Sequence, residues 1–188
     1  ERVAMIPSAS YGMAIVAKNL DLKPDEEIVV LGEQFPSNVY PWRSLIKEKG
    51  GKLITVEAPN SANRGEDWNA RLLASINEKT RMVTMGFVHW ADGTRFGMAA
   101  VRKRTQEVGA WLVIDGTQSV GAMPYDYSKV PVDALICAGY KWLMGPYGLC
   151  FGYFGPAFDG GQTIEENWIN RKGSEDFSSL VNYEDEYA

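Results

Sequence analysis

The sequence predicts an α/β domain of three layers (α/β/α), in which helices cover both faces of a mainly parallel sheet of about seven strands. Short apolar runs of the kind that form buried strands alternate along the chain with segments of helical patterning. This alternation favours parallel strands, because each parallel pair needs a long crossover and a helix usually supplies it. A chain of 188 residues is also long enough to bury a sizeable core.

The apolar runs and the segments between them give the expected elements in order. Strands are expected at residues 3–6, 28–31, 53–56, 82–88, 111–115, 134–138 and 149–154. Helices are expected at residues 11–20, 38–49, 66–77 and 96–108. In the last of these, alanine and valine at 99–101 give an apolar side, basic residues at 102–104 give a solvated side, and Gly109 ends the helix.

The last expected strand, 149–154, is predicted to run antiparallel to its neighbours. The Gly-Pro-Tyr-Gly link at 145–148 is too short for a parallel crossover. Strand periodicity is lost after residue 154, so we divide the chain into a large domain, 1–154, and an excursion, 155–188. The excursion is expected to lead to a small C-terminal domain that is absent here. The start at Glu1 indicates a piece of a longer protein.

Composition excludes several classes of function. A formal net charge of −5 argues against nucleic-acid partners and anionic membrane surfaces, which call for a basic face. The two cysteines, Cys137 and Cys150, lie in apolar runs and are expected to be core thiols in a reducing compartment. Neither a signal peptide nor an apolar run of membrane-spanning length is evident, so a cytoplasmic location is expected.

The ends of two neighbouring strands carry the most informative pair of residues. Asp115 ends the run 111–115, and Lys141 follows the run 134–138. Parallel strands would bring this carboxylate and this amine to the edge of the sheet where α/β proteins bind ligands. Pyridoxal phosphate (PLP) requires both, a lysine to bind its aldehyde and an acid to face its pyridine nitrogen. The alternatives are a helix-capping aspartate and a surface lysine.

Two further segments suit the same cofactor. Ser10 lies near the expected start of the first helix, where free amides and the helix dipole attract a phosphate. Plain N-capping by Ser8 or Ser10 is the alternative. Phe35 and Ser37 follow the second strand, where an aromatic ring can stack on a cofactor and a hydroxyl can reach its phosphate. A core phenylalanine beside a turn is the alternative for Phe35.

Other chemistries have little support. The single histidine, His89, excludes a site with several histidine ligands, and the cysteines lack ligand-like spacing, so no metal is expected. The sequence has no Gly-x-Ser-x-Gly elbow, no Gly-Lys-Ser/Thr phosphate loop and no Gly-x-Gly-x-x-Gly fingerprint.

Two segments resemble motifs of the class V aminotransferase family of fold-type I PLP enzymes, which includes cysteine desulfurases and kynureninases. They are Val-Ile-Asp-Gly-Thr-Gln-Ser-Val-Gly at 113–121 and Ala-Gly-Tyr-Lys-Trp-Leu-Met-Gly-Pro at 138–146. The resemblance runs over nearly the whole chain. It implies a Schiff-base role for Lys141, pairing of Asp115 with the pyridine nitrogen, and a hydrogen bond from Gln118 to the phenolic oxygen.

The resemblance also implies roles for the remaining candidates. Ser10, Ser37 and Tyr140 would lie near the phosphate, Phe35 would stack on the ring, and Asp92 stands where many relatives place an asparagine near the cofactor oxygen. Phe35 departs from the desulfurase pattern, which has a histidine on the ring.

The implied activity is chemistry at the Cα of an amino acid, with transamination favoured. A lyase of kynureninase or cysteine desulfurase type is the alternative, as is a non-catalytic scaffold domain that has kept the fold. A homodimer is expected for the full-length protein.

Overall fold

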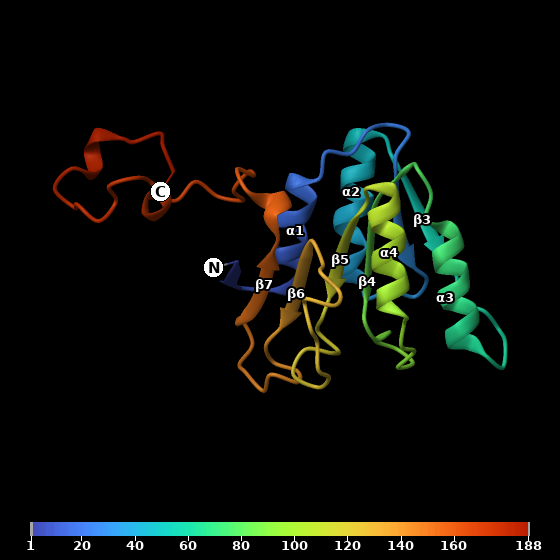
Figure 1. The fold of residues 1–188 in the computed structure, drawn as a ribbon. Helices are drawn as coiled ribbons and strands as arrows, with labels where there is room; N and C mark the ends of the chain where they lie inside the picture. The colour runs from blue at the N-terminus through green and yellow to red at the C-terminus, as the bar shows by residue number, and fades with distance from the viewer. Residues whose placement is uncertain (1, 188) are drawn as a thin grey trace.

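The computed structural model describes residues 2–187 and shows one sheet of seven strands with helices on both faces (Figure 1). The strand order is β1-β7-β6-β5-β4-β2-β3. The strands are β1 (Val3–Ile6), β2 (Glu27–Leu31), β3 (Lys52–Val56), β4 (Thr80–Gly86), β5 (Trp111–Asp115), β6 (Ala134–Ala138) and β7 (Cys150–Phe154). All the predicted strands are present, and the predicted three-layer fold is confirmed.

Four helices form the outer layers, two on each face. They are α1 (Ala9–Asn19), α2 (Tyr40–Lys49), α3 (Arg64–Ser75) and α4 (Met98–Val108). One core joins α1 and α2 to the face that carries Val30, and the other joins α3 and α4 to the face that carries Val29. Consecutive residues of a strand point to opposite faces, so burial of both valines shows that the sheet is covered on both sides.

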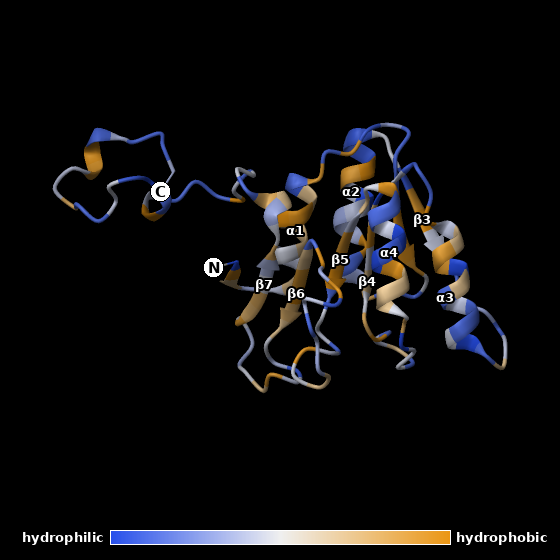
Figure 2. Ribbon diagram, viewed as in Figure 1, coloured by the Kyte–Doolittle hydropathy of each residue, from blue (hydrophilic) through white to orange (hydrophobic). Residues whose placement is uncertain are grey.

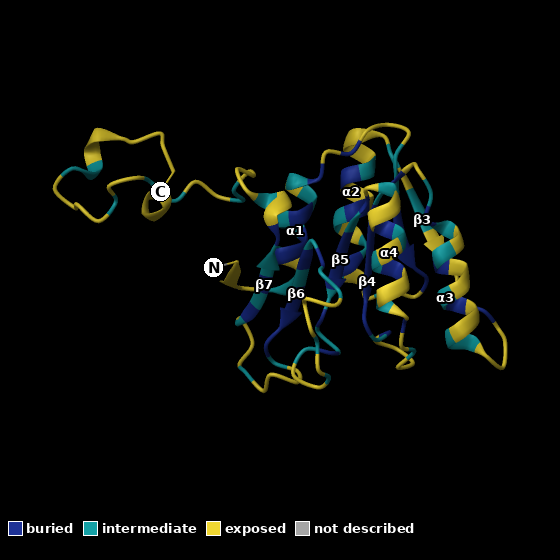
Figure 3. Cartoon of the chain, viewed as in Figure 1, coloured by how far each residue is buried: buried dark blue, intermediate teal, exposed yellow. Residues whose placement is uncertain are grey.

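Hydropathy and burial follow this layering. The strands of the sheet are mainly apolar, whereas the helices carry both apolar and polar residues (Figure 2). Burial is concentrated on the sheet and on the inner sides of the helices, and exposed residues lie on the outer sides (Figure 3). The two largest fully buried side chains are tryptophans, Trp42 of α2 and Trp68 of α3, one in each core.

Strand β7 runs antiparallel to β6 and to β1, as the short link before it predicts. The other pairs, β2 with β3 and β4, β4 with β5, and β5 with β6, are parallel. The carboxyl ends of β4, β5 and β6 therefore meet at one edge of the sheet.

Two predicted boundaries differ in ways that matter for this edge. Helix α1 begins at Ala9 rather than at residue 11, because Ser8 caps it. Strand β4 ends at Gly86 rather than at residue 88, because the chain turns back in a hairpin closed by a bridge between Val88 and Arg95. A Cβ on Gly86 would lie 2.7 Å from the Val88 carbonyl oxygen, so this turn requires glycine.

After β7 the chain leaves the sheet (Figure 1). Residues 155–187 contain three short 3₁₀ helices, at Pro156–Phe158, Trp168–Asn170 and Leu180–Asn182. The start of this segment is tied to the domain by the Arg2–Asp159 ion pair and by two hydrogen bonds between Asn19 and the backbone of Gln162. Over residues 2–187, the helices are too short or too polar to cross a membrane.

Candidate active site

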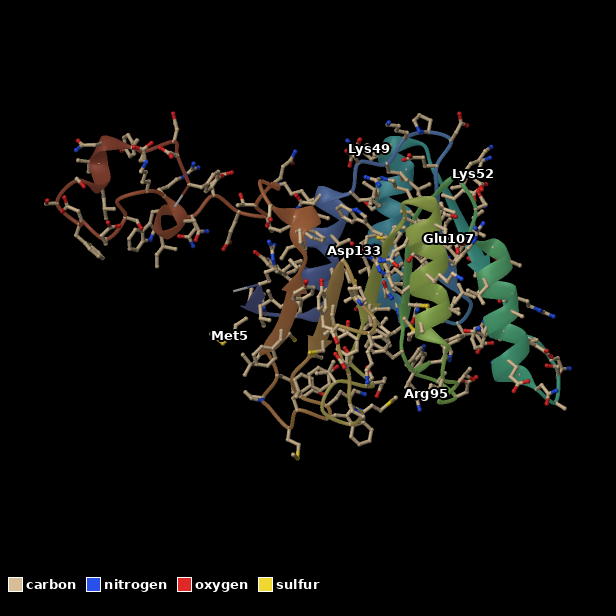
Figure 4. All side chains as sticks on the ribbon, viewed as in Figure 1. Met5, Lys49, Lys52, Arg95, Glu107 and Asp133 are labelled. Carbon is tan, nitrogen blue, oxygen red and sulfur yellow. The ribbon has the colours of Figure 1, made fainter. Side chains whose placement is uncertain are left out.

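A cavity of about 280 Å³ lies at the edge of the sheet where β4, β5 and β6 end, beside the first turn of α1. Figure 4 places Arg95, which follows β4, at this edge and Lys52, the first residue of β3, at the opposite edge. Open α/β sheets bind ligands at the carboxyl ends of their strands. Seven of the eight predicted cofactor residues line the cavity, namely Ser10, Phe35, Ser37, Asp115, Gln118, Tyr140 and Lys141.

Asp115 ends β5 and presents its carboxylate to the cavity. The backbone N–H of Thr117 donates to Oδ1 of Asp115 at 3.0 Å. Burial raises the pKa of this carboxyl, although the hydrogen bonds from Thr117 act in the opposite direction. Turns and isolated bridges follow the strand, so Asp115 does not cap a helix. Its carboxylate forms no ion pair with the described residues, and a ligand cation would therefore offset the cost of its burial.

Lys141 lies in the turn after β6 and also faces the cavity. The turn is closed by hydrogen bonds from the Gly145 amide to the Gly139 carbonyl at 2.8 Å and from the Met144 amide to the Lys141 carbonyl at 3.0 Å. The apolar residues that follow Lys141 do not shield it from solvent. Trp142 and Met144 are 53% and 90% exposed, because the described residues place nothing over this turn.

The N-terminus of α1 contributes two serines. The Oγ of Ser8 accepts from the Tyr11 amide at 3.0 Å, so Ser8 is the N-cap. Ser10 lies within the first turn, and its hydroxyl is 2.9 Å from that of Ser8. Because Ser8 is the cap, the Ser10 side chain and the remaining backbone N–H groups of the first turn lie at the cavity. This arrangement suits an anion.

Phe35 is not a core residue. Its ring is 42% exposed, lines the cavity, and meets the ring of Trp90 edge to face at a centroid distance of 5.4 Å and an angle of 83°. Gln34, beside it, also lines the cavity, and its Nε2 is buried without a hydrogen-bond partner. Sequence reasoning missed Gln34 and Trp90. The position of Trp90 directly after the β4 run, at the predicted ligand edge, is the signal that could have found it.

Asp92 is the predicted residue that does not line the cavity. Its carboxylate is engaged elsewhere, with Nε of Arg64 at 2.8 Å, Nδ1 of His89 at 3.2 Å and the Thr94 amide at 2.9 Å. Burial alone would raise the pKa of Asp92, but the hydrogen bonds from Thr94 and Arg64 outweigh it and bring the pKa to about 2. The structure therefore places Asp92 in the hairpin after β4 and outside the lining of the cavity.

Tyrosines form the wall next to Lys141. The rings of Tyr140 and Tyr147 stack at 4.2 Å with an angle of 20°, and Nζ of Lys141 lies 6.0 Å from the centre of the Tyr140 ring. Burial raises the pKa of Tyr140, and Tyr147 adds to the shift, so Tyr140 stays protonated at neutral pH. On the other side of Lys141, the indole N–H of Trp142 donates to Oε1 of Gln118 at 3.4 Å.

The cysteines are buried, as predicted. Burial raises the pKa of Cys137 to about 11. Cys150 reaches the cavity wall from β7, where its Sγ lies 3.9 Å from the Pro7 carbonyl oxygen. Residues 2–187 contain no cluster of three or more histidine, cysteine or acidic side chains that could hold a metal ion.

The donor set fits a phosphorylated pyridine aldehyde. A half-buried carboxylate without a cation faces the cavity, a primary amine reaches it from the turn after the next strand, and a helix N-terminus borders it. The unpartnered Nε2 of Gln34 offers one more donor. These groups match the pyridine nitrogen, the aldehyde, the phosphate and a ring oxygen of PLP.

Comparisons with known proteins agree with this geometry. The family model described as Aminotransferase class-V matches residues 1–176. A probable cysteine desulfurase of Pyrococcus abyssi is 31% identical over 179 residues, which cover 88% of this chain and 43% of the relative. The chain thus spans less than half of that relative's length.

Two solved structures of the enzyme C-DES share the fold. In one, glycine is covalently linked to the PLP cofactor of a variant; it matches with a TM-score of 0.86 and 21% identity over 100% of this chain and 48% of that chain. The other is a complex of the cystine C–S lyase with its product cysteine persulfide, with a TM-score of 0.82 and 22% identity over 91% of this chain and 46% of that chain.

Proposed function

Because this chain belongs to the class V aminotransferase family, we propose that the whole protein is a PLP-dependent lyase that breaks the Cβ–sulfur bond of an amino acid. The observation that carries the proposal is the convergence of Asp115 and Lys141, from the ends of adjacent strands, on one cavity. The described relatives act on sulfur amino acids, as a probable desulfurase and a C–S lyase.

Different residues of the cavity would bind different parts of PLP. When bound, PLP supplies an electron sink that stabilises negative charge at the substrate Cα. Asp115 would hold the proton on the ring nitrogen, and the resulting ion pair would offset the cost of burying this carboxylate. Ser10 and the amides of the first turn of α1 would bind the phosphate, and Phe35 would pack against the ring.

Lys141 performs the proton transfer. Its amine would hold the cofactor aldehyde, and once a substrate amine displaced it the free Nζ would be placed to take the proton from the substrate Cα. The aromatic neighbours Tyr140 and Tyr147 offer no competing base, because Tyr140 stays protonated. Loss of the Cα proton places negative charge next to Cβ, from which a thiolate can leave.

Transamination is the second candidate. It is favoured by Phe35, because a phenyl ring at the ring-stacking position has no proton to give to a leaving sulfur. Lys141 serves both reactions, so the products must decide between them.

The test uses the full-length protein loaded with PLP. L-Cystine and L-cysteine are supplied in turn, and pyruvate, sulfide and the amine form of the cofactor are measured, with Lys141→Ala as the inactive control. Pyruvate formed over many turnovers, with the cofactor remaining an aldehyde, supports the lyase. Conversion of the cofactor to its amine form, without pyruvate, supports transamination and contradicts the lyase.

A further inference from the structure

Phe35 and Trp90 form an aromatic corner at the open end of the cavity. They come from different strands, Phe35 from the turn after β2 and Trp90 from the hairpin after β4. The two residues are 42% and 46% exposed, and their rings lie edge to face with centroids 5.4 Å apart. Two rings at 83° leave an L-shaped apolar surface that faces a ligand in the cavity.

The corner is held in place from behind. The indole N–H of Trp90 donates to the Glu33 carbonyl at 2.7 Å, and Nε2 of His89 lies 3.2 Å from the Gly32 carbonyl oxygen. The His89 side chain is fully buried. His89 and Trp90, which are consecutive in the hairpin after β4, therefore contact the consecutive carbonyls of Gly32 and Glu33, in the turn that carries Phe35. Trp90 is a fixed wall and not a free surface side chain.

Charge at the open end of the cavity is sparse. Among the described lining residues, Asp115 and Lys141 are the acid and the base, and both have roles towards the cofactor. The aromatic corner itself offers no ion-pair partner to a substrate side chain. A charged side chain placed there would lose hydration without a replacement contact, whereas an apolar one would gain buried area.

We propose that Trp90, beside Phe35, binds the sulfur substituent of the substrate, and that the substrate is a cysteine thioether bearing an aromatic or alkyl group. This inference rests on the proposed lyase function and names its substrate class.

The reaction balances without an oxidant or a reductant. The Cα proton passes to Nζ of Lys141, the Cβ–S bond breaks, and the sulfur leaves with the bonding pair and a proton as a thiol. Water then releases the remaining three carbons as pyruvate and the nitrogen as ammonium. The overall change is thioether amino acid plus water to thiol, pyruvate and ammonium.

The kinetic test uses the full-length protein with PLP and three cysteine thioethers: S-benzyl, S-methyl and S-carboxymethyl. Pyruvate formation gives kcat/KM for each. The expected preference for S-benzyl over S-carboxymethyl is about tenfold or more, since one apolar group in a fitting pocket changes selection by that order. Trp90→Ala should bring the ratio to about one, and Trp90→Phe should retain most of it, because a ring remains. Tyr40→Ala removes an exposed aromatic outside this cavity and should leave the ratio unchanged.

A binding measurement separates the corner from the chemistry. 3-(Benzylthio)propanoate lacks the α-amino group and cannot react, so calorimetry reports contact alone. We expect at least about fivefold weaker binding to Trp90→Ala than to wild type, as aromatic contacts of this kind imply. Equal affinities, or equal kcat/KM for the benzyl and carboxymethyl substrates, would overturn the proposal.

The two proposals fail differently. If cystine and cysteine give pyruvate but the benzyl and carboxymethyl substrates do not differ, the corner is wrong and the lyase stands. If none of the sulfur compounds gives pyruvate, the lyase fails, and the substrate class falls with it even where the calorimetry shows contact.

Discussion

The hydroxyl of Thr117 accepts a hydrogen bond from the backbone N–H of Ala138 at 3.1 Å, which joins the loop after β5 to the end of β6. The amide of the same threonine donates to Asp115. One residue therefore orients the carboxylate and also fixes the strand end that leads to Lys141. The two chemical groups of the site are held in register by this contact and not only by the pairing of β5 with β6.

Thr117→Val should therefore loosen the site. Valine keeps the shape of threonine but leaves the Ala138 N–H unpaired, at a cost of about 1–3 kcal/mol. We expect a lower free energy of unfolding and weaker PLP binding, measured by denaturant titration and by cofactor absorbance. Thr117→Ser keeps the hydroxyl and is the matched control. Equal behaviour of the valine and serine variants would contradict this role.

Lys141 should carry the cofactor covalently. Reduction of the PLP-loaded protein with borohydride is expected to leave a pyridoxyl group on the peptide that contains Lys141, because this amine lines the same cavity as Asp115. Peptide mass spectrometry reads the result. Label on another lysine, with PLP demonstrably bound, would show that the assignment is wrong. Lys141→Ala should bind PLP without any label.

Asp115→Asn should have opposite effects with and without PLP. Burial raises the pKa of Asp115, so the stability that the protonated form contributes is fully present below the unfolded pKa of about 3.9. That stability is lost as the pH rises through the folded pKa. Without PLP, the asparagine variant should melt at a higher temperature than wild type at pH 7, with the difference vanishing near pH 3.

With PLP bound, wild type should melt at a higher temperature than the asparagine variant. The ring nitrogen then lacks its carboxylate in the asparagine variant, and turnover should fall about a hundredfold or more, since electrostatic contacts of this kind are worth roughly 2.7–4 kcal/mol. Melting curves of both forms over a pH series, together with steady-state rates, check the prediction. A variant that is less stable than wild type without PLP at pH 7 would indicate that the carboxylate has a partner in the empty protein.

The sequence pattern was sufficient for the sheet, and it selected residues that mostly line one cavity, because both depend on local signals. Buried strands show as apolar runs, and the short link before β7 allows only an antiparallel return. Asp115 and Lys141 could be paired because parallel strands bring their ends together. The start of α1 was misplaced because Ser8 and Ser10 are equally good caps in sequence, and only the backbone shows which one is used.

The errors at the site come from contacts between distant segments. Asp92 lies outside the cavity and pairs with Arg64, which is 28 residues away on α3. No local sequence pattern predicts that ion pair. Trp90 was missed for the same reason, since its contacts are to Glu33 and Phe35. The solvent exposure of the turn after Lys141 could not be predicted, because the apolar sequence of the turn does not show whether other segments pack over it.

That exposed turn leads to a prediction about assembly. Met144 is 90% and Tyr147 82% exposed, and Met144 has a φ of +52°, a backbone conformation that is uncommon for residues other than glycine. We expect a second subunit to cover this turn, so that the full-length protein is a homodimer. Light scattering at micromolar concentration should give twice the monomer mass, and Met144→Glu should shift the equilibrium towards monomer. A monomeric wild-type protein would contradict the prediction.

The full-length protein should release sulfide from L-cysteine with pyruvate and not with alanine. Alanine formation by a desulfurase requires a mobile, exposed thiolate to take the sulfur as a persulfide. Burial raises the pKa of Cys137 to about 11, and Cys150 is 2% exposed and fixed in β7 with its Sγ next to the Pro7 carbonyl. Neither cysteine of this chain can leave its strand to reach a sulfur at the substrate Cβ.

The desulfurase reaction also needs an acid that protonates the departing sulfur, and Phe35 cannot supply it. In the proposed role of Phe35 against the cofactor ring, its phenyl group has no ionisable atom to protonate a departing sulfur. Direct elimination depends on Lys141 alone, and its products are sulfide, pyruvate and ammonium. The protein is supplied with L-cysteine and a reductant, and alanine and pyruvate are quantified by chromatography. Pyruvate should dominate; alanine equal to the sulfide released would show instead that a cysteine beyond residue 188 accepts the sulfur.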